Sequence, residues 1–183
     1  MRRTVLLYGL LSGVVGFVLW LITQSLSTSP DGKLDFSKGE LFGYINMILA
    51  LSLVFFGVRQ YRDKNLGGNI NFGKAFQVGI LIALVAGLMY VAGWMIYYYT
   101  EPSAKQHLLQ YTDYMKEKWV AAGMSAEELA KKTAELEKNM EMIKNPFILA
   151  LFTFFEILPV GAIVSLISAF ILKNGGKKVV SSE

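Results

Sequence analysis

Four runs of apolar residues, each long enough to cross a lipid bilayer, constrain this 183-residue chain more than any other feature. A transmembrane helix needs roughly 17–25 residues at a rise of about 1.5 Å each. The runs satisfy this length and lie at about 4–23, 41–58, 75–99 and 147–172. With 54% hydrophobic residues, the chain has too few polar side chains to cover the surface of a water-soluble protein. We therefore predict an all-α, multi-pass integral membrane protein.

A long polar segment, residues 101–145, separates the third apolar run from the fourth and holds fifteen of the 32 charged residues. Apolar side chains recur in it every three or four residues on both sides of Gly123, as in two amphipathic helices. Ser125 and Glu128 have the spacing of a capping box, which begins the second of these helices. We predict an antiparallel, coiled-coil-like hairpin inserted between spans three and four. The chain then divides into 1–100, 101–145 and 146–183, the last holding span four and a basic tail.

Small residues four apart mark three of the four predicted spans. Such spacing lets two helix backbones approach closely, which is how helices associate in lipid. The second run has no comparable stripe. Packing into a four-helix bundle is one interpretation, and a homodimer through an unused stripe is the other. The residues concerned are Gly9, Gly13 and Gly16 in the first run, Gly79, Ala83 and Gly87 in the third, and Gly161, Ser165 and Ala169 in the fourth.

The basic residues predict the orientation by their density, because their number is equal on the two sides. Lys and Arg favour the cytoplasmic side of membrane spans when they lie in short loops. Nine of them lie in the first loop and the hairpin. The other nine lie in the N-terminus, the second loop and the C-terminal tail, which together are shorter, and these are Arg2, Arg3, Arg59, Arg62, Lys64, Lys74, Lys173, Lys177 and Lys178. We expect both termini in the cytoplasm and the hairpin on the extracytoplasmic side.

Glu156 is the main candidate for a functional side chain, because it lies deep in the fourth run. An ionisable residue at the centre of a span costs at least about 2.5 kcal/mol on insertion scales and is a functional-site candidate by default. Pro159 follows it and is expected to bend the helix, since proline cannot donate to the carbonyl group four residues earlier. Asn46 in the second run is expected at a similar depth. Glu156 either bonds Asn46 or a tyrosine hydroxyl as a structural lock, or serves as a proton, cation or lipid-headgroup site.

The composition removes several kinds of chemistry from consideration. The chain has no cysteine and a single histidine, His107, which we expect to be a surface helix residue rather than a zinc ligand. No grouping typical of catalytic acids, nucleophiles or metal ligands stands out, so we predict neither an enzyme nor a cofactor. The net charge of +4 is explained by membrane orientation without a nucleic-acid partner.

Three short patterns together resemble an uncharacterised bacterial family of multi-pass membrane proteins. They are the Gly67-Gly68 to Gly79 stretch with Phe72-Gly73-Lys74-Ala75-Phe76, the Gly123-Met124-Ser125 turn, and Gly161 with Ser165-Leu166-Ile167. The family is catalogued as domain of unknown function 4199. The resemblance implies a bacterial inner-membrane protein and brings no activity, cofactor or catalytic residue.

Two functional hypotheses remain after these arguments. The first is a non-enzymatic subunit or adaptor of the inner membrane that binds a protein partner through residues 103–144 of the hairpin. The second is a small transporter or lipid-handling protein that works through Glu156. A water-filled cavity reaching Glu156 would favour the second hypothesis over the first.

Overall fold

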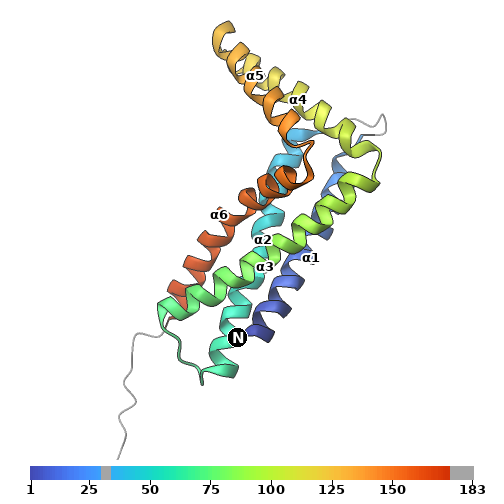
Figure 1. Ribbon diagram of the computed structural model, residues 1–183. Helices are drawn as coiled ribbons and strands as arrows, with labels where there is room; N and C mark the ends of the chain where they lie inside the picture. The colour runs from blue at the N-terminus through green and yellow to red at the C-terminus, as the bar shows by residue number, and fades with distance from the viewer. Residues whose placement is uncertain (30–33, 174–183) are drawn as a thin grey trace, which may run out of the picture.

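The computed structural model describes residues 1–29 and 34–173, and these residues form six α-helices. Four helices of 26 to 30 residues are long and apolar enough to cross a membrane: α1 (Arg2–Ser27), α2 (Phe36–Asn65), α3 (Phe72–Thr100) and α6 (Pro146–Leu172). Two shorter helices, α4 (Ser103–Ala121) and α5 (Ala126–Met142), form the hairpin (Figure 1). The prediction of an all-α membrane bundle is confirmed. Lys177 and Lys178, which entered the orientation argument, lie outside the described residues.

The α2 helix extends beyond the apolar run of 41–58 at both ends. It begins after Asp35, whose carboxylate accepts a hydrogen bond of 3.1 Å from the backbone N–H of Lys38 and so caps the first turn. Its last turns are polar, and residues such as Arg, Lys and Gln continue a helix readily. Gly67 and Gly68 then reverse the chain with φ values of 61° and 88°, which glycine adopts without strain.

The α3 helix is at the centre of the bundle, where it packs against α1, α2 and α6. The α2 helix also contacts α1 and α6. The N-terminus lies at one end of this bundle and the hairpin projects from the other (Figure 1). The hairpin therefore covers only the end of the bundle opposite the N-terminus.

The predicted stripes of small residues lie in contacts between helices of the same chain. A Cβ atom at Gly13 of α1 would lie only 2.5 Å from the Cβ atom of Met89 in α3. On α6, a Cβ atom at Gly161 would lie 2.9 Å from that of Ala83, and Gly79 of α3 packs equally closely on Ser165. The absence of side chains at these glycines is what permits the approach.

The α2 helix carries two glycines of the same spacing, Gly39 and Gly43, contrary to our expectation that span two has no such stripe. The expectation was wrong because the apolar run begins at residue 41, whereas the helix begins at Phe36. Apart from the adjacent backbone of α2, no atom of the described residues lies within 4 Å of a Cβ atom built at either glycine. These two glycines therefore face open space.

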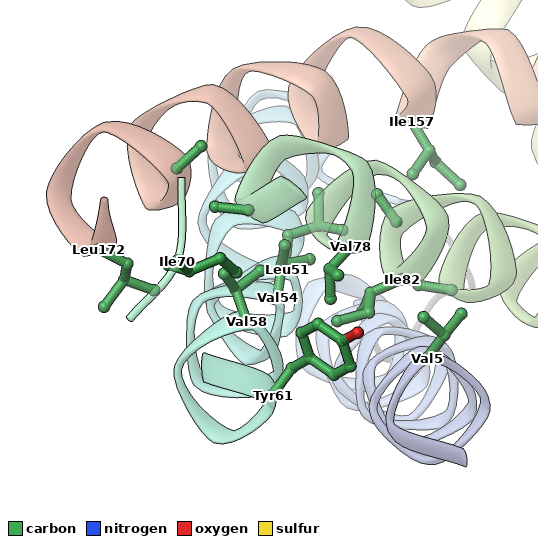
Figure 2. Close-up of a cluster of buried hydrophobic side chains, with 14 residues drawn as sticks. Val5, Leu51, Val54, Val58, Tyr61, Ile70, Val78, Ile82, Ile157 and Leu172 are labelled. Carbon is green, nitrogen blue, oxygen red and sulfur yellow. The ribbon is translucent and has the colours of Figure 1, made fainter. Parts of the chain in front are cut away.

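The main hydrophobic core lies in the half of the bundle away from the hairpin. Most of its members come from the beginning of α1, the first half of α3 and the second half of α2 and of α6, and Ile70 joins them from the segment between α2 and α3. Val54, Val58, Val78 and Ile82 are fully buried there, and Figure 2 shows them packed together between the helices. This half of the bundle is closely packed.

The hairpin is attached to the bundle mainly through α4. The ring of Phe36, at the start of α2, lies 5.7 Å from that of Tyr111 and 5.4 Å from that of Tyr114. Ala104 is buried in a small second core with Tyr98 and Leu149. The α5 helix has no buried residue and begins with the capping box of Ser125 and Glu128. The hairpin thus has one docked helix and one outer helix.

Candidate functional site

A cavity of about 1060 Å³ lies between the bundle and the hairpin, and all six helices contribute to its lining. We call it the main cavity. Pockets for small molecules usually measure roughly 300–1000 Å³, so the main cavity has room for a drug-sized or lipid-like molecule. It lies in the half of the bundle opposite the main hydrophobic core, although Leu51, Ala86 and Ile157 belong to both. One half of the bundle is thus closely packed, and the other half contains the main cavity.

Two glycines of α2 and two exposed aromatic side chains border this space. Gly39 and Gly43 of α2 border the main cavity and contribute no side chain to its lining. Tyr44 of α2 and Phe155 of α6 also line the cavity and are both 61% exposed. Exposed side chains on the first halves of α2 and α6 therefore border the cavity.

Glu156 lines the main cavity from α6. It is ten residues beyond Pro146, which is about 15 Å along the helix at the usual rise. Its side chain is exposed within the cavity, and in the described part of the chain its carboxylate has no hydrogen-bond or ion-pair partner. The α6 helix continues through Pro159, the other residue singled out beside it, and the expected bend stays a prediction.

Asn46 is not the partner of Glu156 that the sequence suggested. Its side-chain amide donates one hydrogen bond of 2.6 Å to the hydroxyl oxygen of Thr23 and one of 3.2 Å to the carbonyl oxygen of Leu19. Both acceptors are on α1, so Asn46 ties α2 to α1. It lines the main cavity as Glu156 does, but its donors are used in holding the bundle together.

The other charged side chains in the main cavity are paired with each other. Lys118 of α4 donates to both carboxylate oxygens of Glu40 in α2, at 2.8 and 3.1 Å. This hydrogen bond raises the pKa of Lys118. Burial raises the pKa of Tyr111, and the negative charges of Glu40 and Glu156 raise it further. Both carboxylates therefore raise the pKa of Tyr111. Glu40 is paired with Lys118, whereas in the described residues Glu156 has no cationic side chain paired with it.

Aromatic rings cover much of the cavity wall. Trp20 of α1 packs edge-on against Trp94 of α3, with ring centroids 4.9 Å apart. Tyr90 of α3, Tyr111 of α4 and Phe152 of α6 line the same space. Because aromatic faces carry partial negative charge, such a wall attracts cations as well as apolar groups.

His107 is half-buried, contrary to the expectation of a water-exposed surface position. It lies between the main cavity and a second cavity of about 650 Å³. Its Nδ1 atom is buried and has no hydrogen-bond partner among the residues that the structure describes. Burial lowers the pKa of His107, and the nearby charge of Glu101 opposes the shift. His107 is partly covered because α4 is docked on the bundle as well as on α5.

The sequence identified two polar residues of the site, Glu156 and Asn46, and missed the ion pair and the aromatic wall. Glu40 and Lys118 are 78 positions apart and each looks like an ordinary surface charge. Trp20 is one of several aromatic residues at helix ends and has no distinguishing neighbour. Hydropathy along the chain gives no signal for contacts of this kind.

A family model described as "Protein of unknown function (DUF4199)" matches residues 7–174 of the chain. This match confirms the resemblance drawn from the three short patterns. No curated protein and no solved structure matches the chain.

Proposed function

The chain belongs to the family described as "Protein of unknown function (DUF4199)", and we propose a function from its cavity and its four helices that are apolar enough to cross a membrane. The protein binds a small amphipathic molecule in the main cavity, as a transporter or lipid-handling protein, with Glu156 as its intramembrane ionisable site. The observation that carries this proposal is the extension of the cavity to Glu156.

The uneven packing of the bundle supports this proposal. A carboxyl group inside a span is costly, and such groups usually face a bundle interior or a water-filled cavity that they serve. If Glu156 were only a structural lock, hydrogen-bond partners would surround it, as they surround Asn46. Glu156 instead faces open space, while the half of the bundle beyond it is closed by Val54, Val78 and Ile82.

The proposed location is the bacterial inner membrane with both termini in the cytoplasm. The density of basic residues near the N-terminus and in residues 59–74 supports this orientation. In this orientation the hairpin and the main cavity are on the extracytoplasmic side, and the closely packed core is on the cytoplasmic side. The cavity would then receive its ligand from the outer leaflet or from the extracytoplasmic water.

Thiol labelling tests the proposal directly, because the natural chain has no cysteine. Thr153→Cys places a thiol on the cavity wall, and Ile163→Cys places one on an exposed part of α6 that does not line the cavity. A membrane-impermeant thiol reagent added to the extracytoplasmic side is expected to label position 153 and leave position 163 unlabelled. The reason is that thiols react as thiolates, which form in water and not in lipid.

Two results would oppose the proposed function. Equal, slow labelling of both positions would mean that no water reaches the cavity, and the transporter or lipid-handling hypothesis would fail. Labelling of position 153 only from the cytoplasmic side would keep the cavity but reverse the orientation. A buried control, Val54→Cys, is expected to stay unlabelled from either side, since Val54 is fully buried.

A second candidate function is that of an adaptor, and the position of α5 favours it. The helix contributes no buried residue and contacts little besides α4, so its outer surface is free to bind a protein partner. A partner that co-purifies in mild detergent, and is lost when residues 103–144 are replaced by a Gly/Ser linker, would support this function. A possible homodimer is tested by the same purification, from the mass of the protein in detergent.

A further inference from the structure

We infer that the ligand of the main cavity is an organic cation with an apolar body, held by the carboxylate of Glu156 within a wall of aromatic rings. This inference rests on the proposed function and specifies its substrate class. It follows from three observations, which concern charge, aromatic lining and the shape of the opening.

The charge of the cavity lining is not balanced. Among the lining residues of the described chain, the charged side chains are Glu40, Lys118 and Glu156. Glu40 and Lys118 neutralise each other through their two hydrogen bonds. An ionised Glu156 therefore leaves one uncompensated negative charge. An unpaired charge away from bulk water is unfavourable, and an incoming cation would compensate it, whereas an anion would increase the imbalance.

The aromatic rings of the lining favour a cation of low charge density. Trp20, Tyr90, Trp94 and Tyr111 come from α1, α3 and α4 and surround the same space as Glu156. Aromatic rings attract quaternary ammonium and similar cations to their faces. A small inorganic cation would instead require several oxygen ligands at short distance. In the described residues no group of three or more acidic or histidine side chains is close enough to hold a metal ion.

The opening of the cavity indicates the apolar part of the ligand. Tyr44 and Phe155 line the cavity and are largely exposed on the outer surface of helices that are apolar enough to cross a membrane. Phe152, which is 48% exposed, lies on the same side. A ligand with an apolar body can enter from the membrane and leave that body among these side chains while its charged group reaches Glu156. A fully polar cation would gain nothing from this side of the cavity.

Tetraphenylphosphonium and tetraphenylborate provide a matched pair of probes, because they have nearly the same shape and opposite charge. Binding of each to the full-length protein in a neutral maltoside detergent is measured by equilibrium dialysis, with empty micelles subtracted. We expect tetraphenylphosphonium to bind at least about tenfold more tightly than tetraphenylborate, since the unpaired carboxylate attracts one and repels the other. The same ordering is expected at low and moderate salt.

Two variants identify the carboxylate responsible. Glu156→Gln keeps the size of the side chain and removes the charge, and we expect it to weaken tetraphenylphosphonium binding about tenfold or more. Glu137→Gln is the matched control, because Glu137 pairs with Lys116 on the hairpin and does not line the cavity. It is expected to leave binding unchanged. The comparison of the two probes on the unchanged protein remains decisive even if Glu156→Gln folds poorly.

The outcomes separate this inference from the proposed function. If position 153 is labelled from water but tetraphenylborate binds as well as tetraphenylphosphonium, or neither binds, the cavity remains and the cationic ligand is wrong. If tetraphenylphosphonium binds and Glu156→Gln has no effect, the cation is held elsewhere and the assignment to Glu156 is overturned. If position 153 is not labelled from water, the proposed function fails whatever the probes do.

Discussion

Gly13 and Gly43 allow one substitution, glycine to alanine, to be compared at two helical positions with opposite surroundings. Both residues lie within transmembrane helices and neither has a positive φ angle. At Gly13 the added Cβ atom would lie 2.5 Å from the Cβ atom of Met89 and 2.7 Å from the carbonyl oxygen of Ala86. At Gly43 it would have no atom within 4 Å. We expect Gly13→Ala to destabilise the protein and Gly43→Ala to preserve or raise its stability.

The magnitudes follow from two opposing effects. Alanine is favoured over glycine in a helix by about 0.5–1 kcal/mol, and this gain applies at both positions. Overpacking of a close interface costs about 1–3 kcal/mol. At Gly13 a side-chain rotation cannot relieve the whole cost, because two of the three contacted atoms are the backbone oxygen of Ala86 and the Cβ atom of Met89. These two ranges give an expected net loss of up to about 2.5 kcal/mol for Gly13→Ala.

The free energy of unfolding is measured by titrating the purified variants from mild detergent into denaturing detergent, with helicity as the signal. The mass of each variant in mild detergent is determined in parallel, so that a change of oligomeric state is not mistaken for a change of stability. If Gly13→Ala is as stable as the natural chain, the close contact of α1 and α3 is not what holds them together. A loss at Gly43 equal to that at Gly13 would show that glycine is needed there for another reason.

Three further predictions concern the bundle, the histidine and the orientation. Asn46→Leu removes the two hydrogen bonds to α1 and is expected to cost about 0.5–1.7 kcal/mol in the same unfolding titration, while Ser52→Ala, which loses only a bond to its own helix, should cost less. Because burial lowers the pKa of His107, its neutral form is favoured, and the single histidine signal in an NMR titration should reach half-protonation below pH 6.5; a midpoint at or above 6.5 would contradict its half-buried position. Reporters fused after Lys64 and inserted at Gly123 are expected to report cytoplasm and outside respectively, and the opposite result would place the hairpin in the cytosol.

The transmembrane helices and the hairpin were predictable because the signals for them are local. Whether a run of apolar residues can span a bilayer depends on the length of that run alone. The capping pattern of Ser125 and Glu128 depends on two residues three positions apart. The bounds were less accurate, as in α2, because polar residues continue a helix beyond the apolar part. The glycine pair of α2 was missed for this same reason.

The sequence by itself determined that the chain would be a helical membrane protein and that Glu156 would be an exceptional residue within it. These conclusions depend only on hydropathy, spacing and the cost of a carboxylate in lipid. The tertiary structure decided what surrounds that carboxylate. In it, Asn46 donates a hydrogen bond to Thr23 of α1, Glu40 pairs with Lys118, and Glu156 lines an open cavity. These contacts depend on which helix faces meet, and helices packed by small residues in lipid have no hydrophobic pattern that specifies those faces in advance.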